Sequence, residues 1–293
     1  MEFKSICVED KPIFDKFIKP YTFSTCEYSF TNLYLWRKGC EIKYCIYNDT
    51  LIIKKSGFDA SDYFMQPIGY KKENLKDLVE ALYKYKEENN MEYLFKDAEA
   101  SFIEDLNEIF PGKFEIKEDR DNFDYIYDSK DLISLSGKKF HGQKGHYNHF
   151  VKNNEYRVSE YEEHIGCECI KASREWCSKN FCKGYLLFEL KGIEDVIRNG
   201  DKLDIDCMAV YLKDKVVAFT IGERVNDDMA IIHVEKADAD IKGLYAFINK
   251  TFVERYYSDA KYINREQDLG MEGLRKVKES YHPVIMGKKF SVK

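Results

Sequence analysis

Hydrophobic and polar positions alternate in the C-terminal half of the chain in the pattern of an antiparallel meander. Apolar side chains take every second position from Leu203 to Tyr211, and a nearly continuous apolar run extends from Val216 to Gly222. A third apolar run covers Met229 to Val234, and short charged or amide stretches between the runs predict turns. Strands joined by such short turns pair antiparallel, so this half is expected to begin with a three-stranded sheet.

Helical spacing replaces this alternation after the third strand. Apolar positions three and four residues apart predict a helix from about Ile241 to Tyr257, followed by a short strand from Tyr262 to Asn264. A second helix is predicted from Met271 to Tyr281, before Pro283 stops it, and a last strand from Val284 to Val292. In that second helix three apolar side chains are expected to face inward: Leu274, Val277 and Tyr281.

The N-terminal half repeats this order of elements without evident sequence identity. The strands predicted there cover Glu41 to Tyr47, Leu51 to Lys54, Tyr63 to Ile68, Tyr93 to Phe95, Phe114 to Lys117 and Tyr125 to Tyr127. The remaining predicted helices lie around Phe14 and from Phe30 to Trp36, Leu75 to Asn89, Ser101 to Phe110, Glu162 to Asn180 and Leu187 to Arg198. The order of meander, helix, strand, helix and strand therefore occurs twice, which indicates an internal architectural repeat.

The repeat predicts an α/β (α+β) protein of two tandem domains, each with a mixed, mostly antiparallel sheet flanked by helices. We place the N-terminal domain at residues 1–130 and the C-terminal domain at residues 131–293, with the boundary between Asp128 and Ser136. A chain of 293 residues, 44% hydrophobic and 33% charged, has the size and composition for two medium globular domains.

Bulk composition limits the classes of function. A net charge of −6 excludes a protein whose whole surface binds nucleic acid. No apolar run approaches the roughly 18 residues that span a bilayer, and the start lacks the features of a signal peptide, so a cytoplasmic location is expected. In that reducing compartment the nine cysteines are interpreted as small buried hydrophobic residues. The group of Cys167, Cys169, Cys177 and Cys182 fits no common zinc spacing, so no metal site is expected.

Basic residues gather in one segment that contains no acid. Between Ser136 and Asn153 stand four lysines and three histidines, interleaved with aromatic residues. Such a segment is typical of a phosphate-contacting surface, and a solvated basic helix face is the alternative. The residues assigned to this surface are Lys139, His141, Lys144 and Asn148.

The densest group of ionisable and amide side chains lies where the strand Tyr262–Asn264 is expected to end. Polar groups follow one another there, and α/β folds commonly build sites where a strand is followed by a helix. Arg265 offers a bidentate partner for a carboxylate or phosphate, and because successive strand residues point oppositely, Arg265 and Glu266 need not both face the site. Helix capping by Asp268 together with a surface ion pair is the alternative.

Three groups of residues resemble one known family. They are Gly137–His141 with Lys144, Asn148 and Phe150; Glu235–Ala237 with Gly243–Tyr245 and Asn249; and Asn264–Glu266 with Asp268–Gly270, Gly273–Arg275, Lys278, Ser280–Tyr281 and Pro283. Together with the doubled element order, they are similar to a bacterial family related to the C-terminal domain of phosphatidylglycerol lysyltransferase, a tandem of GNAT-type acyltransferase domains. The chain departs from the pattern at Gly145 and His146, where the family commonly has an Arg-Asn pair.

This resemblance implies where a site would lie. In GNAT domains the third meander strand and the helix after it diverge from the neighbouring strand, and the gap holds the acyl donor. The residues implied as catalytic are Glu235, Arg265, Glu266 and Tyr281. The residues implied as substrate- or donor-binding are Lys139, His141, Lys144, Asn148, Asp238, Asn249, Asn264, Asp268, Arg275 and Lys278. For Glu235 a solvated strand end, and for Tyr281 a core aromatic, are the alternatives.

The loop after Glu235 bears on the choice of donor. CoA-dependent GNAT domains hold pyrophosphate on the N–H groups at this helix start, but here Asp238 and Asp240 stand in that position. A like-charge contact at about 4 Å costs roughly 4 kcal/mol at an effective dielectric near 20. The loop therefore disfavours CoA and favours an aminoacyl-tRNA or a cationic substrate. Helix capping by either aspartate is the alternative.

We therefore expect an acyl- or aminoacyltransferase that moves its group to an amine or hydroxyl acceptor, either a small-molecule amine or a lipid-like molecule. The donor would be aminoacyl-tRNA or acyl-CoA, with tRNA as partner in the first case, and no other cofactor is expected. The N-terminal domain is expected to be mostly structural. Two alternatives stay open: a CoA-dependent N-acetyltransferase and a non-catalytic, GNAT-like ligand-binding protein.

Overall fold

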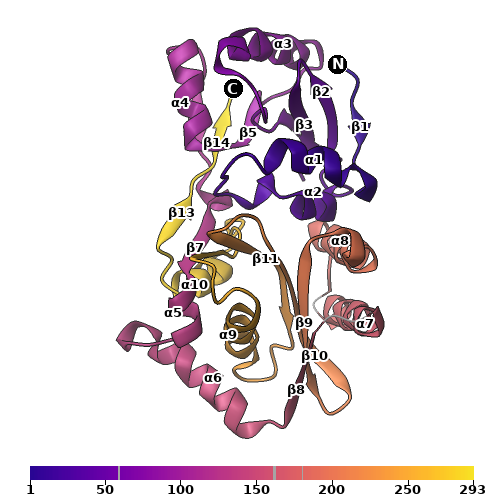
Figure 1. Ribbon diagram of the computed structural model, residues 1–293, viewed down its shortest axis with the longest axis vertical. Coiled ribbons are helices and arrows are strands. Elements are labelled where there is room, and N and C mark those ends of the chain that lie inside the picture. Colours follow the sequence, from indigo (N-terminus) through magenta and orange to yellow (C-terminus); the bar gives the residue numbers. More distant parts are fainter. Residues whose placement is uncertain (59, 161–162, 180) are drawn as a thin grey trace. The chain divides into compact units, whose positions relative to one another are not determined.

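The chain forms two compact units, each built around one mixed sheet (Figure 1). The computed structural model describes residues 1–58, 60–160, 163–179 and 181–293. One unit comprises residues 1–123 and 287–293, and the other comprises residues 124–286. The expected α/β (α+β) class, with two mostly antiparallel sheets flanked by helices, is confirmed. That the first domain is structural and the second carries the site stays a prediction.

Seven strands form each sheet within the described residues. The first sheet has the order β1 (Lys4–Ser5), β2 (Lys43–Tyr47), β3 (Thr50–Ser56), β4 (Asp62–Phe64), β5 (Phe95–Ala98), β14 (Phe290–Val292) and β6 (Ile116–Glu118). The second sheet has the order β8 (Tyr156–Glu160), β9 (Ile205–Leu212), β10 (Lys215–Arg224), β11 (Met229–Ala237), β12 (Tyr262–Asn264), β7 (Asp124–Asp128) and β13 (Ile285–Gly287).

The two sheets share one topology. In each, four successive antiparallel strands, β1 to β4 and β8 to β11, are followed by a parallel pair, β4 with β5 and β11 with β12. The next place is taken by a strand from the other half of the chain: β14 pairs antiparallel with β5, and β7 pairs antiparallel with β12. The single last strand expected from Val284 to Val292 is therefore wrong, because β13 and β14 belong to different sheets. Between them Lys289 is buried in the first unit, where its ammonium forms an ion pair with Glu27.

Helices cover the sheets in both units. Their bounds are α1 (Lys11–Ile18), α2 (Phe30–Trp36), α3 (Leu75–Glu88), α4 (Ala100–Ile109), α5 (Ser129–Ser134), α6 (His141–Asn153), α7 (Glu163–Lys179), α8 (Tyr185–Arg198), α9 (Leu244–Tyr256) and α10 (Glu272–Glu279). The expected ends of the helix now called α7, Glu162 and Asn180, lie outside the described residues. In the second unit α9 covers one face of the sheet and α7 and α8 cover the other (Figure 1). None of the helices within the described ranges has the length and apolar composition needed to cross a membrane.

Helix α6 packs on α9 with its backbone in direct contact at Gly243. This glycine precedes α9 with a φ of 86°, in the left-handed region, and a Cβ placed on it would lie 2.1 Å from the carbonyl oxygen of His146. Only a residue without a side chain permits both features. The approach fixes α6 against the start of α9, with Phe150 buried between them.

Replacing Gly243 should therefore destabilise the second unit. We expect Gly243→Ala to lower the free energy of unfolding by about 2 kcal/mol or more, because strain at a positive φ adds to the overlap with His146. Gly142→Ala in α6 is the matched control, since nothing lies within 4 Å of its Cβ position, and alanine favours helix. Denaturant unfolding of both variants checks this; equal effects would contradict the packing argument.

The face of α10 that is buried in the structure differs from the face that its apolar residues predicted. Tyr281 is buried as expected, but Leu274 and Val277 are exposed, and the one residue that α10 itself buries is Lys278. The ammonium of Lys278 donates hydrogen bonds to the backbone carbonyl oxygens of Arg265 and Glu266. The inward assignment of Leu274 and Val277 is thus wrong, because polar partners rather than apolar burial orient this helix.

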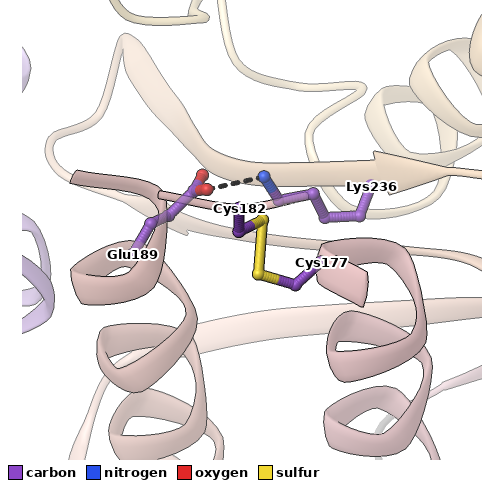
Figure 2. The surroundings of a disulfide bond; sticks show 4 residues. All are labelled: Cys177, Cys182, Glu189 and Lys236. Carbon is purple, nitrogen blue, oxygen red and sulfur yellow. Dashed lines mark hydrogen bonds and ion pairs between the residues drawn. A yellow bond between two sulfur atoms is a disulfide. The ribbon is translucent and has the colours of Figure 1, made fainter. Parts of the chain in front are cut away.

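Two cysteines differ from their expected role. Cys177, in the last turn of α7, forms a disulfide bond with Cys182, which precedes α8 (Figure 2). Figure 2 also shows the ion pair between Lys236 of β11 and Glu189 of α8, with the ammonium 2.7 Å from a carboxylate oxygen. The interpretation of all cysteines as small buried hydrophobes is wrong for this pair, and Cys7 and Cys167 are exposed as well.

Candidate functional site

The parallel strands β11 and β12 separate at their carboxyl ends. Their pairing begins at Met229 with Tyr262 and ends at Ile231 with Asn264. β11 then continues to Ala237 alongside β10, while β12 stops. The end of β11, the turn after β12 and helix α9 therefore meet where the two strands diverge.

An ion pair links the two diverging segments. A guanidinium nitrogen of Arg265, from the turn after β12, lies 3.0 Å from one carboxylate oxygen of Glu235 on β11. The side-chain amide of Asn249, from α9, donates to the other carboxylate oxygen at 2.9 Å. The guanidinium also lies 4.8 Å from the ring centroid of Tyr281 and 5.7 Å from that of Tyr127. Four residues predicted for the site, Glu235, Arg265, Asn249 and Tyr281, are therefore brought together.

Two polar atoms of this cluster are buried without a hydrogen-bond partner among the described residues. They are the second terminal nitrogen, Nη1, of Arg265 and the amide oxygen, Oδ1, of Asn249. An unsatisfied buried polar atom costs about 1–3 kcal/mol, so such atoms mark positions that a ligand or a water molecule fills. One donor and one acceptor thus flank the Glu235 carboxylate. The side chains of Arg265 and Glu235 keep 10% and 12% exposure.

A buried histidine that the sequence analysis missed lies beside the pair. The register of β10 against β11 shifts so that Ile221 faces Val234 and Gly222 faces Ile232, which leaves His233 as the extra residue of a bulge. The ring of His233 lies 2.8 Å from a Glu266 carboxylate oxygen and 3.0 Å from one of Glu223. Its only sequence signal was a single histidine inside an apolar strand.

Charge at this histidine is fixed by its two carboxylates. Burial by itself would lower the pKa of His233, but the hydrogen bonds that its ring donates to Glu223 and Glu266 outweigh it and raise the pKa from 6.5 to about 10. The imidazole is therefore protonated at neutral pH, and Glu266 is committed to a buried ion pair. A catalytic role for Glu266 stays a prediction; the structure gives its carboxylate a partner in His233.

The turn after β12 is held in place by hydrogen bonds to its backbone carbonyl oxygens. Glu266 has a φ of 58°, in the left-handed region that costs energy for a non-glycine residue. Lys278 binds the carbonyl oxygens of this turn, and the Tyr127 hydroxyl donates to the carbonyl of Lys278 at 2.8 Å. Burial and the nearby guanidinium of Arg265 lower the pKa of Lys278 to about 8.

The first unit contains a similar left-handed acid. Asp97, near the end of β5, has a φ of 58°, and its carboxylate lies 2.8 Å from the buried ammonium of Lys55. Because both repeats place a buried, ion-paired acid in this backbone conformation, we interpret the Glu266 turn as part of the architecture. The side chains next to this turn differ between the units, since the ion pair of Arg265 with Glu235 belongs to the second unit.

Asp268 and Asn264 complete the turn. The Asp268 carboxylate accepts hydrogen bonds from Arg275 at 2.8 and 2.9 Å, from the Tyr125 hydroxyl at 2.6 Å and from the backbone N–H of Gly270 at 2.8 Å. Burial opposes ionisation, but these donors hold the pKa of Asp268 at about 2. Capping of α10 by Asp268 is not observed, because Met271 occupies the N-cap position. Asn264 accepts the Glu266 N–H at 2.7 Å, which also orients the turn.

The other predicted residues lie away from the pair. Asp238 forms an ion pair with Lys179 at 3.0 Å, inside a cavity of about 380 Å³ between α7 and the strands β10 and β11. Exposed positions on α6 and just before it hold Lys139, His141, Lys144 and Asn148. Lys139 is paired with Asp131 at 2.8 Å. The structure thus separates the expected donor-binding set into a buried cluster and an outer basic surface.

Comparison with known proteins gives a family and a fold. Residues 18–293 match the family model described as phosphatidylglycerol lysyltransferase, C-terminal. An uncharacterized protein of Mycoplasmoides gallisepticum is 24% identical over 217 residues, which is 67% of this chain and 65% of that protein. The match therefore spans slightly less than two thirds of this relative.

Solved structures show the same architecture. A conserved protein of unknown function from Bacteroides thetaiotaomicron is 32% identical, with a TM-score of 0.91, covering 100% of this chain and 99% of that one. L-PGS from Bacillus licheniformis superposes with a TM-score of 0.67 at 15% identity, covering 97% and 92%. A tandem GNAT protein from the clavulanic acid biosynthesis pathway has a TM-score of 0.51 at 6% identity, covering 100% and 98%. The last two comparisons support the tandem GNAT-like fold alone.

Proposed function

This chain belongs to the phosphatidylglycerol lysyltransferase C-terminal family, and from this membership we propose that it is an aminoacyltransferase whose reaction centre is the pair Glu235–Arg265. A lysyltransferase is, by its name, an enzyme that moves an aminoacyl group. The proposed donor is an aminoacyl ester carried by tRNA, and the proposed acceptor is an amine or a hydroxyl group.

The observation that supports this proposal is the pair of unsatisfied atoms beside Glu235. An aminoacyl ester has a carbonyl oxygen that accepts hydrogen bonds and an α-ammonium group that donates them. Arg265 Nη1 is the donor for such a carbonyl oxygen, and Asn249 Oδ1 is the acceptor for such an ammonium. The Glu235 carboxylate between them adds a negative charge beside the ammonium. A simple acyl group would leave the Asn249 oxygen unpaired.

The proposed chemistry is direct attack. The acceptor nitrogen or oxygen adds to the ester carbonyl carbon, and the negative charge that develops on the carbonyl oxygen is stabilised by the Arg265 guanidinium. The ester C–O bond then breaks, and the proton lost by the acceptor ends on the departing ribose hydroxyl. Glu235 and Asn249 hold the α-ammonium group so that the carbonyl meets the acceptor in one orientation. Tyr281 keeps the guanidinium in place through its ring.

The loop after β11 offers little support for a CoA donor. Several of its backbone N–H groups already have partners: Asp238 donates to Val217 at 2.9 Å, and Ile241 donates to Asp238 at 3.1 Å. The N–H of Asp240 donates to the Asp238 carboxylate at 3.2 Å. A pyrophosphate would have to displace these bonds and approach two carboxylates. These contacts favour a donor that this loop does not hold through pyrophosphate.

The test is to offer both donors. The protein is incubated with tRNA charged with labelled amino acids, or with labelled acetyl-CoA, and with a panel of amines and hydroxyl compounds. We expect label to leave charged tRNA and appear on an acceptor, and Asn249→Ala to slow this by at least about tenfold, since the α-ammonium loses its partner. Consumption of acetyl-CoA alone would support the N-acetyltransferase instead. Binding without consumption of either donor would support a ligand-binding protein.

A further inference from the structure

The disulfide bond of the second unit lies beside the cavity between α7 and the strands β10 and β11. Cys177 stands in α7 between Trp176 and Lys179, which both line this cavity of about 380 Å³. Its partner Cys182 is half-buried and follows Phe181, which is 82% exposed. A small thiol in solution therefore reaches the bond from the side of Cys182.

The bond fixes the last turn of α7. One turn earlier the helix is held to α8 by a bidentate pair, in which Arg174 lies 2.6 and 2.8 Å from the Glu194 carboxylate oxygens. In the last turn Lys179 pairs with Asp238 at 3.0 Å and with Asp240 at 3.6 Å, but its side chain is 57% exposed. Because such exposed ion pairs contribute little to stability, the position of this turn depends mainly on the covalent bond.

Trp176 links this turn to the end of β11. The Lys236 ammonium lies 4.1 Å from the centroid of the Trp176 ring, and the same ammonium pairs with Glu189 of α8 (Figure 2). Only 12% of the Lys236 side chain is exposed, so this cation–π contact is stronger than one in open solvent. Lys236 directly follows Glu235, one of the two residues of the proposed reaction centre. A change in the position of Trp176 therefore acts on the neighbour of Glu235.

Trp176 also contacts the start of α9. Burial and the charge of Glu235 raise the pKa of Tyr245, in the first turn of this helix, while a hydrogen bond from the Trp176 side chain opposes the shift. One helical turn farther along α9 is Asn249, whose amide donates to Glu235. The last turn of α7 thus reaches two of the segments that position the Glu235 carboxylate, β11 and α9.

We propose that Cys177–Cys182 is a thiol–disulfide exchange site whose state controls the order of the cavity wall and, through Trp176, of the end of β11 and the start of α9. When the bond is closed, the last turn of α7 holds Trp176 against Lys236. When it is reduced, this turn opens locally while the rest of α7 stays packed. The inference does not rest on aminoacyl transfer, because none of its contacts requires a donor or an acceptor.

The reagent for this exchange is a low-molecular-weight thiol. Its thiolate attacks the more accessible sulfur, that of Cys182, forms a mixed disulfide there and releases Cys177 as a thiolate, which takes up a proton. A second reagent thiolate then attacks the reagent sulfur of the mixed disulfide and releases Cys182. Two reagent thiols are oxidised to one disulfide, and the two cysteines gain two electrons and two protons. The reagent's own disulfide is the oxidant for the reverse reaction.

The experiment uses the full chain with Trp36→Phe, which leaves Trp176 as the one tryptophan. The protein is equilibrated in buffers of reduced and oxidised glutathione, without any donor, and maleimide labelling with mass spectrometry follows Cys177 and Cys182. We expect the emission of Trp176 to shift to longer wavelength in step with the appearance of these two thiols. Amide hydrogen exchange in the last turn of α7 and at residues 236–245 should become about tenfold faster, with no change in the first unit.

Two variants complete the test. Cys177→Ser combined with Cys182→Ser should show the emission of the reduced protein in every buffer. Cys167→Ser removes an exposed free thiol from the same helix, and this matched control should respond to glutathione like its parent. Unchanged emission and exchange rates after reduction of both cysteines would overturn the proposal. A bond that stays closed in excess reduced glutathione would also overturn it, because the disulfide would then be a permanent structural link.

Discussion

Arg265→Ala is expected to lower kcat/KM for aminoacyl transfer by a factor of about one hundred to one thousand. Its guanidinium is the charged donor proposed for the carbonyl oxygen, and loss of such a donor in acyl transfer typically costs this much. Arg265→Lys keeps the positive charge but loses the planar fork that reaches Glu235 and the carbonyl together. We expect this variant to remain at least about tenfold slower than the unchanged enzyme.

The control for Arg265 comes from the same region of the chain. Lys276, on the exposed side of α10, has 72% side-chain exposure, and Lys276→Ala should leave the transfer rate unchanged. Initial rates with charged tRNA, together with melting temperatures of all variants, separate loss of chemistry from loss of fold. A rate for Arg265→Ala within threefold of the unchanged enzyme would exclude the guanidinium from the reaction.

His233→Ala is expected to destabilise the second unit by about 3–5 kcal/mol. The substitution leaves Glu223 and Glu266 buried next to each other without the imidazolium that now lies between them. Removing one partner of a buried ion pair has an effect of this size, because the remaining charge is left uncompensated. The backbone turn that presents Arg265 depends on Glu266, so the loss should also reduce activity. A free energy of unfolding within 1 kcal/mol of the unchanged protein would contradict this role.

The pH dependence of the free energy of unfolding tests the protonation of His233 independently. Its pKa is about 10 in the folded protein and 6.5 as an ordinary histidine, so the folded state binds the proton more tightly. The resulting stabilisation is fully present below pH 6.5 and is lost as the pH rises toward 10. We expect His233→Gln to remove this part of the pH dependence between pH 6.5 and 10. Urea unfolding at several pH values measures it.

The alternating strands of the C-terminal half could be read from the sequence because their apolar positions are local and regular. Leu203–Tyr211, Val216–Gly222 and Met229–Val234 became β9, β10 and β11 with small shifts at their ends. The exchange of β7 and β14 between the two sheets could not be read in this way. It depends on pairing between residues far apart in the chain, as in Ile263 with Tyr127, which no local pattern encodes.

The pair Glu235–Arg265 was accessible to sequence reasoning because Glu235 lies near the end of β11 and Arg265 follows β12, and the two strands are parallel. The orientation of α10 was not, since Lys278 turns inward for two backbone carbonyls that become available only when the Glu266 turn has formed. His233 was missed for a similar reason. A histidine in an apolar strand indicates nothing until the fold brings two carboxylates to its ring nitrogens.

The most direct test of the reaction centre is the affinity for two analogues of the 3′-terminal adenosine of a charged tRNA. One carries an aminoacyl group through a stable amide, and the other carries the same group without its α-amino nitrogen. We expect at least tenfold tighter binding of the amino analogue, and loss of this preference in Asn249→Ala, because a buried acceptor left unpaired weakens binding. Equal affinity of the unchanged protein for both analogues would contradict this prediction.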